Sequence, residues 1–201
     1  MIAVVDYEAG NLKSVETALS YLGADFFISS DPEKLAGADK MLFPGVGEAA
    51  AAMAVLRKTG LDRVIREFAE SGKPLMGICL GSQILFGHSE ESDTECLGIL
   101  PGRVRQFSSD MGLKIPHMGW NTLHHTNHPL FKDIPQEKSF YFVHSYYVEA
   151  ENPSDVIGTS DYGINFTAAV ARGNVMATQF HPEKSGEWGL KILKNFMDYR
   201  G

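Results

Sequence analysis

Residues 74–87, PLMGICLGSQILFG, constrain the fold of this chain more than any other stretch. Residues 74–78 are a short apolar run, which is typical of a strand buried on both faces of a parallel sheet. The run leads into G-I-C-L-G at 77–81, and residues 82–86 can continue as a helix. In the comparable G-x-S-x-G pattern, a nucleophile sits on a sharp strand-to-helix turn and the glycines leave room for the backbone. Cys79 is therefore either a thiol nucleophile at a helix N-terminus, which stabilises a thiolate, or a buried structural cysteine between packing glycines.

The length and composition favour one domain spanning residues 1–201, with a core large enough to need no covalent staples. The formal net charge of −7 offers no basic surface for nucleic acid or an anionic membrane. No apolar run approaches the ~20 residues of a membrane span, and the N-terminus has no basic region typical of a signal peptide. The two cysteines, Cys79 and Cys96, do not make a disulfide framework. We therefore expect a cytoplasmic protein with a free thiol at Cys79.

The order of expected elements indicates the fold class. Apolar runs alternate with helical periodicities in the first half, with strands expected at 1–5, 25–30, 41–43 and 74–78 and helices at 12–22, 48–58 and 61–71. The second half is strand-like at hairpin spacing, with pieces in 97–121, 140–148, 155–160, 165–171 and 174–180, before a last helix from about 186. This order predicts a three-layer α/β fold: a mostly parallel central sheet flanked by helices, with an antiparallel β-rich C-terminal half. Ligands of such sheets gather at the carboxyl ends of the strands, where Cys79 and the loop 44–47 would lie.

A cysteine nucleophile needs a base, and the base needs an acceptor that orients it. His181 and Glu183 occur in F-H-P-E-K-S at 180–185. In an extended segment, residues two apart point to the same side, and Pro182 fixes the φ angle between them. The Glu183 carboxylate would then accept the Nδ1 proton of His181 and leave Nε2 to face the sulfur. An isolated H-P-E is more typical of a solvated loop, but its combination with G-x-C-x-G favours a Cys-His-Glu triad.

The segment P-G-V-G at 44–47 has two interpretations. One is an ordinary tight turn before a helix. The other is a source of main-chain N–H groups which, together with the N–H of Leu80, would form an oxyanion hole worth ~3 kcal/mol per donor.

Four segments together resemble the class I (triad) glutamine amidotransferases: P-G-V-G at 44–47, G-I-C-L-G-S-Q at 77–83, V-H-S-Y at 143–146 and Q-F-H-P-E-K-S at 179–185. The match runs from the N-terminus to the final helix. Three more segments narrow it: D-Y at 6–7, G-N-L at 10–12 and M-G-W-N at 118–121. These resemble the glutaminase subunits of imidazole glycerol phosphate synthases. The resemblance implies a flavodoxin-like fold and no cofactor or metal.

The resemblance also implies a role for each matching residue. Cys79 attacks the carboxamide of glutamine, His181 moves the protons, Glu183 orients the imidazole, and a glutamyl thioester forms as ammonia leaves. The implied oxyanion-hole residues are Val46, Gly47 and Leu80. The implied substrate-binding residues are Gly45, Gln83, His144, Ser145 and Tyr146. The segment 143–148 remains open to a second interpretation, a core strand with one hydrogen-bonded histidine.

The implied partner is a (β/α)₈-barrel cyclase subunit in a heterodimer, which receives the ammonia through a protected route. The implied products are imidazole glycerol phosphate and an aminoimidazole carboxamide ribotide, in histidine biosynthesis. The expected docking residues are Asn11, Trp120, Tyr141 and Lys184, because an exposed Trp is a common interface anchor. Trp120 fits a core position equally well.

Two other signals in the sequence have simpler interpretations, and three other functions remain as alternatives. The histidines at 117, 124, 125 and 128 lack a metal-binding motif, so we expect surface histidines in a polar loop. The acidic segment 89–95 is expected to be solvated. The alternatives are the glutaminase subunit of another synthase, such as that of pyridoxal phosphate synthesis, a stand-alone cysteine hydrolase of γ-glutamyl or peptide bonds, and a catalytically silent binding module.

Overall fold

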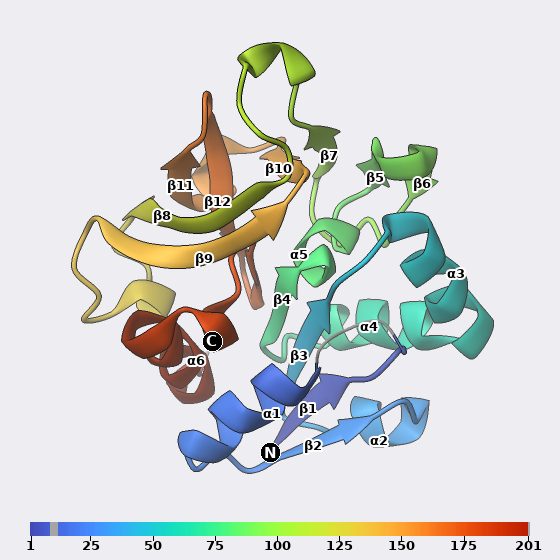
Figure 1. The fold of residues 1–201 in the computed structure, drawn as a ribbon. Coiled ribbons are helices and arrows are strands. Elements are labelled where there is room, and N and C mark those ends of the chain that lie inside the picture. Colours follow the sequence, from blue (N-terminus) through green and yellow to red (C-terminus); the bar gives the residue numbers. More distant parts are fainter. Residues whose placement is uncertain (9–11, 201) are drawn as a thin grey trace.

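The computed structural model describes residues 1–8 and 12–200, and its centre is a large mixed sheet (Figure 1). Five neighbouring strands run parallel in the order β2-β1-β3-β4-β13. Their bounds are β1 Ile2–Val5, β2 Phe26–Ser29, β3 Lys40–Gly45, β4 Leu75–Cys79 and β13 Val175–Thr178. The last strand of the chain thus pairs with β4, which brings the C-terminal segment beside Cys79.

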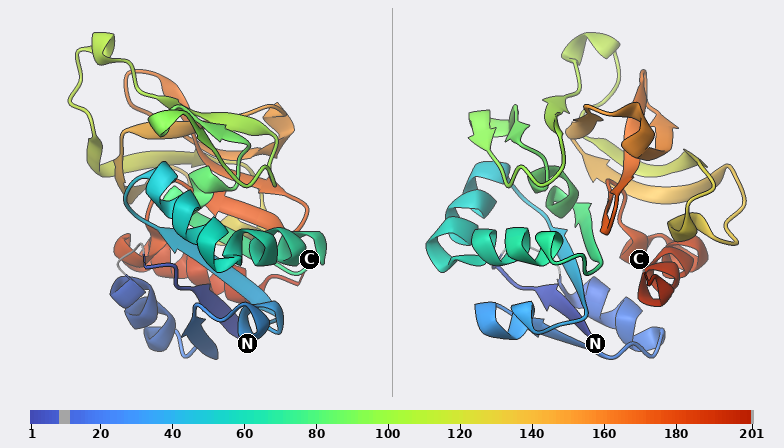
Figure 2. Two further views of the ribbon diagram at one scale, coloured as in Figure 1. Left: turned by 90° about the vertical axis from the view of Figure 1, so that its right-hand side faces the viewer. Right: turned by 180° about the vertical axis from the view of Figure 1, so that it is seen from behind.

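Helices cover both faces of the parallel strands (Figures 1 and 2). One face carries α1 (Leu12–Tyr21) and α6 (Gly186–Asp198), and the other carries α2 (Pro32–Ala36), α3 (Ala49–Thr59) and α4 (Leu61–Glu70). Asp31 begins α2 by accepting a hydrogen bond from the Glu33 amide, which is the expected cap before a proline at the first helical position. These helices and strands match the sequence-based expectation closely.

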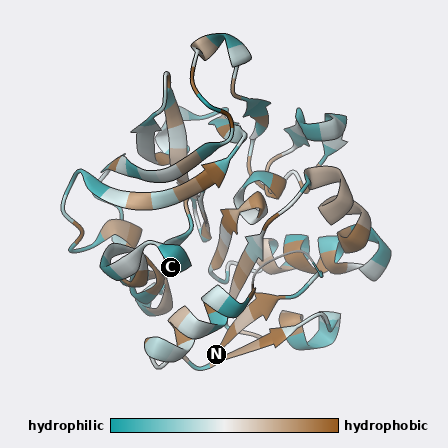
Figure 3. Ribbon diagram, in the orientation of Figure 1, coloured by the Kyte–Doolittle hydropathy of each residue, from teal (hydrophilic) through white to brown (hydrophobic). Residues whose placement is uncertain are grey.

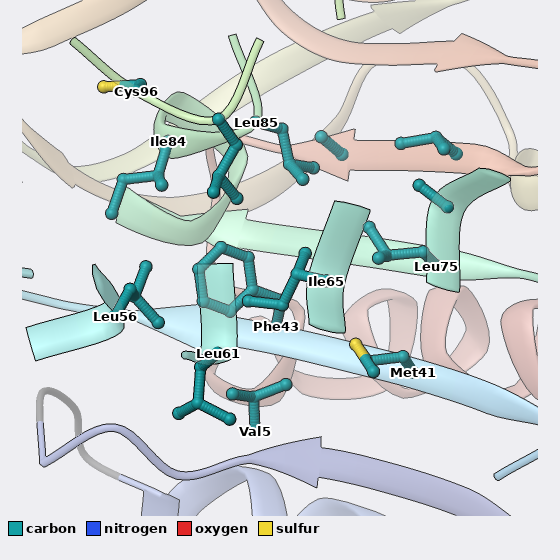
Figure 4. Close-up of a cluster of buried hydrophobic side chains, with 14 of the residues drawn as sticks. Val5, Met41, Phe43, Leu56, Leu61, Ile65, Leu75, Ile84, Leu85 and Cys96 are labelled. Atoms are coloured by element: carbon teal, nitrogen blue, oxygen red, sulfur yellow. The ribbon is translucent and has the colours of Figure 1, made fainter. Parts of the chain in front are cut away.

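The alternation of side chains along β1 explains why both faces are covered. Ala3 and Val5 pack in the cluster under α2–α4, whereas Ile2 and Val4 pack in the cluster under α1 and α6. Because neighbouring residues of a strand point to opposite faces, a continuous apolar strand needs a core on each side. Figure 3 shows these strands as hydrophobic through the middle of the molecule, and Figure 4 shows the first cluster from within.

The second half of the chain extends this sheet with antiparallel strands. The path continues through β12 (Asn165–Arg172), β10 (Tyr146–Ala150), β7 (Gly102–Gln106), β5 (His88–Ser89) and β6 (Thr94–Glu95). A branch carries β11 (Val156–Asp161), β8 (His117–His125) and β9 (Lys138–His144). Short helical turns join the strands: α5 (Leu80–Ile84), η1 (Glu91–Asp93), η2 (Ser109–Met111), η3 (Pro129–Phe131), η4 (Pro153–Asp155) and η5 (Pro182–Lys184).

The α/β fold with parallel central strands and an antiparallel second half is confirmed, with two corrections of detail. The strand expected at 140–148 is two strands, β9 and β10, which separate at Ser145. The loop expected at 44–47 begins as strand, because β3 runs to Gly45 and pairs it with Cys79. Within the described residues, no helix has the length and apolar character to cross a bilayer.

Candidate active site

Cys79 sits at a strained bend between a strand and a helix. It is the last residue of β4 and the residue before α5, with φ 54° and ψ −112°. A positive φ is uncommon for a side chain with a Cβ, and such strained residues cluster at functional sites. The sulfur is nearly buried, but it reaches a cavity in the protein surface.

The packing of this bend requires a glycine at position 81, two residues after Cys79. A Cβ on Gly81 would lie 1.8 Å from the carbonyl oxygen of Phe43, so β3 and α5 touch through their backbones. Gly45 is similarly enclosed, since a Cβ there would lie 2.2 Å from the Tyr7 hydroxyl and 2.9 Å from the Gly81 nitrogen. Close approach of α5 to β3 therefore fixes the position of Cys79 beside the end of β3.

His181 and Glu183 form a buried hydrogen-bonded pair. His181 Nδ1 lies 2.8 Å from Glu183 Oε1, and the two side chains are 2% and 4% exposed. The carboxylate accepts, so Nδ1 carries the proton and Nε2 is left for the sulfur. The expected pairing occurs, but the expected extended geometry is wrong: Glu183 lies in the 3₁₀ turn η5, several residues past the end of β13. The Nε2 atom has no partner among the described residues.

The charges around His181 set its protonation state. Burial lowers the pKa of His181, but the neighbouring Cys79 and Glu183 outweigh burial and raise that pKa to about 10. At neutral pH the imidazole is therefore protonated, between Cys79 and the Glu183 carboxylate. Burial first and Cys79 second raise the pKa of Tyr7, whose hydroxyl stays neutral beside Gly45.

Gln179 contacts the sulfur of Cys79, and Gln83 holds Gln179 in place. Gln179 Nε2 lies 3.9 Å from Cys79 Sγ, and Gln83 Nε2 donates to both Gln179 Oε1 and the Tyr146 carbonyl at 3.0 Å. The thiol faces the carbonyl of Val143 at 3.8 Å. The sequence predicted no role for Gln179. Its position two residues before His181 is the signal that could have indicated that both side chains point to the same side of the backbone.

A cavity of about 250 Å³ opens over the sulfur. Its walls come from six parts of the chain, and the lining residues are Val46, Gly47, Cys79, Leu80, Gln83, Glu91, Pro116, Val143, His144, Ser145, Tyr146 and His181. Most residues expected to bind substrate or oxyanion are in this set. Gly45 is not, because it lies behind the wall and packs against α5.

Glu91 is the one carboxylate among the described residues that line the cavity. Its Oε2 accepts a hydrogen bond of 2.8 Å from the Ala49 amide at the start of α3, and burial raises the pKa of its carboxyl group. The expectation that the whole acidic segment 89–95 is solvated is therefore wrong at this residue. The sequence pattern held no signal for it, since the contact joins segments 42 residues apart.

The residues expected at a docking surface differ in exposure. Trp120 and Met118, on one face of β8, are 59% and 61% exposed, so a core position for Trp120 is wrong. The Tyr141 ring lies edge-on to Trp120 at 6.1 Å, and the Tyr141 carbonyl accepts from the His181 amide at 2.9 Å. Lys184 is half-buried in η5, and Asn11 lies outside the described residues.

The cluster of histidines is not a polar loop. His117, His124 and His125 belong to β8, and His117 is buried. No group of three or more His, Cys, Asp or Glu side chains is placed to hold a metal ion within residues 1–8 and 12–200. Burial of His117 depends on its hydrogen bond to His144, which is 27 residues away in the sequence.

Comparison with known proteins places this geometry in a family. The family model for class-I glutamine amidotransferases matches residues 3–199. Imidazole glycerol phosphate synthase subunit HisH of Neisseria meningitidis serogroup B is 50% identical over 98% of this chain and 99% of its own. The subunit of the same name from Herpetosiphon aurantiacus is 47% identical over 98% of this chain and 94% of its own.

Solved structures show the same fold. The structure of PurLQS from Thermotoga maritima superposes with a TM-score of 0.77 at 24% identity, over 98% of this chain and 97% of that chain. A crystal structure of a glutamine amidotransferase gives 0.77 at 20% identity, over 98% of both chains. With the family model matching almost every residue, this chain belongs to the class-I glutamine amidotransferases.

Proposed function

We propose that this chain hydrolyses glutamine to glutamate and ammonia at Cys79 and supplies the ammonia to the cyclase subunit of an imidazole glycerol phosphate synthase. The observation that carries the proposal is the arrangement of a strained cysteine and a buried His181–Glu183 pair around one cavity. Family membership supplies the reaction class, and the two HisH relatives supply the synthase.

The first half of the reaction starts with the protonated imidazole of His181 beside the sulfur. The Cys79 thiolate attacks the carboxamide carbon of glutamine, and the oxygen becomes an oxyanion. Leu80 at the start of α5, Val46 and Gly47 line the cavity, and the Leu80 amide with an amide of Val46 or Gly47 would stabilise the negative charge. The C–N bond then breaks as the His181 imidazolium gives its Nε2 proton to the departing nitrogen. Ammonia and a glutamyl thioester result.

The second half reverses the role of His181. Having lost its proton, the imidazole accepts one from water through Nε2, and the hydroxide attacks the thioester carbonyl. The C–S bond breaks, glutamate leaves, and the thiolate–imidazolium pair is restored. Throughout both steps Glu183 holds Nδ1–H by the 2.8 Å hydrogen bond, which keeps Nε2 directed toward the sulfur.

We assign the amino-acid end of glutamine to the outer cavity wall. Glu91 supplies a negative charge for the α-ammonium group. Gln83 and the segment His144–Ser145–Tyr146 also line the cavity, where the Ser145 hydroxyl is a hydrogen-bond donor that suits the α-carboxylate. Because an ammonium group and a carboxylate must both be satisfied, this wall selects free glutamine over a glutaminyl residue inside a peptide, whose α-groups are in amide bonds.

We propose that the cyclase partner is a (β/α)₈ barrel and that it docks on the surface around Trp120. Support comes from the exposed Met118 and Trp120 side chains, which lie on the strand next to Tyr141. Since the Tyr141 carbonyl holds the His181 amide, a partner pressing on this surface lies close to the catalytic base. Exposed aromatic anchors are typical of binding hot spots. Asn11 and Lys184 complete the proposed interface.

We further propose that residues 1–201 act as one amidotransferase domain in the cytoplasm. The family match over residues 3–199 and the single sheet shared by both halves support one domain. Two free cysteines, Cys79 and Cys96, suit a reducing compartment.

The test is glutamine hydrolysis with and without the cyclase subunit, measured as glutamate released. We expect slow hydrolysis by the chain alone and rapid, coupled hydrolysis once the cyclase is added. Stimulation by the synthase subunit of pyridoxal phosphate synthesis instead would reassign the partner. Rapid cleavage of γ-glutamyl peptides without any partner would make this chain a stand-alone hydrolase. Replacing Trp120 by Ala should weaken cyclase binding, whereas the matched change at Tyr21, an exposed aromatic residue of α1, should not.

A further inference from the structure

A chain of hydrogen bonds runs from the cavity wall to the outer side of β8. His144 Nδ1 lies 2.7 Å from the Tyr146 carbonyl oxygen, and His144 Nε2 lies 2.9 Å from His117 Nδ1. His117 Nε2 lies 3.2 Å from the amide nitrogen of Asn121, which also donates to the Asp161 carbonyl at 2.9 Å. Two histidines 27 residues apart in the sequence thus meet ring to ring between β8 and β9.

The position of every proton in this series of hydrogen bonds follows from the chemistry of its two ends. A carbonyl oxygen only accepts, so His144 Nδ1 carries a proton and donates to Tyr146. His144 Nε2 must then accept, which makes His117 Nδ1 the donor. His117 Nε2 is left to accept from Asn121, whose amide nitrogen is a donor. Both rings are therefore neutral and both are protonated at Nδ1.

The surroundings favour neutral rings and hold them in place. His117 and His144 are 3% and 5% exposed, and burial lowers their pKa values to about 4 and about 3. The His117 ring stacks on Tyr162 at 4.0 Å and on Phe142 at 5.0 Å. Protonation of His144 would set its Nε2–H against the Nδ1–H of His117, and protonation of His117 would set its Nε2–H against the amide N–H of Asn121.

The inner end of this series of hydrogen bonds, at Tyr146, holds the cavity wall beside the nucleophile. The Tyr146 carbonyl accepts from both His144 and Gln83, while the Val143 carbonyl in the same segment faces Cys79 Sγ. His144 and Tyr146 line the cavity, whereas His117 does not. The side chain of His117 therefore reaches the cavity wall through its hydrogen bond to His144.

We propose that His117 is a positioning residue for glutamine: by donating its Nδ1 proton to His144, it locks the tautomer of His144 and fixes the 143–146 wall that binds the substrate. This inference rests on the proposed glutaminase function. Without the His117 donor, His144 can carry its proton on Nε2, and the hydrogen bond to Tyr146 is lost.

Two substitutions separate the donated proton from the packing of the ring. His117→Phe keeps the aromatic stack but removes both nitrogens, whereas His117→Asn places an amide N–H on Cγ, the carbon that bears Nδ1 in histidine. In the complex with the cyclase, we expect His117→Phe to raise KM for glutamine about tenfold with kcat within about threefold. His117→Asn should recover most of the loss. A matched control on the same strand is His124→Phe, at an exposed position, which should leave KM unchanged.

Ammonia-supported synthesis by the same complexes reports whether each variant is folded and docked, and it should be equal in all of them. A wild-type KM in His117→Phe would overturn the positioning role. So would an equal loss in His117→Phe and His117→Asn, because the retained N–H would then be irrelevant. A wild-type complex that releases no glutamate would refute the proposed function, and the positioning role with it.

Nitrogen-15 NMR of the wild-type histidines tests the proton arrangement without any enzyme assay and without a variant that must fold. At pH 7 both His117 and His144 should show a protonated Nδ1 and an unprotonated Nε2. An Nε2–H tautomer or an imidazolium at either ring would overturn the inference, whatever the activity.

Discussion

Replacing Glu183 by Gln removes the charge that orients His181 while leaving the size of the side chain unchanged. The hydrogen bond to be weakened is 2.8 Å long and joins side chains that are 2% and 4% exposed. A hydrogen bond to a charged group contributes about 3 kcal/mol at the upper end, which corresponds to ~100-fold in rate. We therefore expect kcat for glutamine hydrolysis to fall about 100-fold. The neutral amide does not stabilise the imidazolium of His181, and it does not fix the tautomer of the neutral imidazole that forms during the reaction.

Glu183→Gln should also lower the free energy of unfolding by about 3 kcal/mol, because the buried His181 imidazolium loses its counter-charge. The assay is glutamate release by the complex with the cyclase, with ammonia-supported synthesis as the internal reference. Glu187→Gln, an exposed change in the first turn of α6, is the matched control. A kcat within about threefold of the wild-type value would refute the role given to Glu183, and an equal loss of ammonia-supported synthesis would indicate general damage instead.

Three further predictions concern the nucleophile, the bend and the buried histidines. Cys79→Ala should abolish glutamine-dependent synthesis by the complex while ammonia-supported synthesis survives; loss of both would mean that Cys79 is structural. Gly81→Ala should lower the free energy of unfolding by about 3 kcal/mol or more in denaturant titrations, since its Cβ would lie 1.8 Å from a Phe43 backbone oxygen; a near-wild-type midpoint would contradict the packing. Because the folded-state pKa values of His117 and His144 are about 4 and about 3, below the ordinary 6.5, only the unfolded chain gains these protons as pH falls below 6.5. Each histidine should then reduce the free energy of unfolding by about 1.4 kcal/mol for each unit that the pH falls near pH 5. In His117→Phe, the free energy of unfolding should therefore fall less steeply with decreasing pH. An unchanged slope would show that His117 is charged in the folded state.

The parts of the fold that were predictable have local causes. Continuous apolar runs such as 74–78 give buried parallel strands because both faces need cover, and the pattern G-x-C-x-G marks a bend where Gly81 touches β3. His181 and Glu183 were found as a pair because they are close in sequence. Even there, the local geometry was wrong, since a 3₁₀ turn rather than an extended strand brings them together.

The parts that were not predictable depend on contacts between distant segments. Gln179 reaches Gln83 across 96 residues, and His117 meets His144 only because β8 pairs with β9. Glu91 enters the cavity because its segment folds back on the start of α3. In each case, the residue type is polar and its partner is far away in the sequence, so local periodicity does not distinguish it from a solvated position.

The central claim is that Cys79 forms the covalent bond to the substrate, and covalent labelling tests it most directly. The complex with the cyclase would be incubated with a glutamine analogue that carries a chloroketone in place of the carboxamide, then analysed by intact mass and peptide mapping. We predict a single adduct on Cys79 whose formation slows when glutamine is added in excess. An unlabelled Cys79, or an adduct on Cys96 alone, would contradict the account.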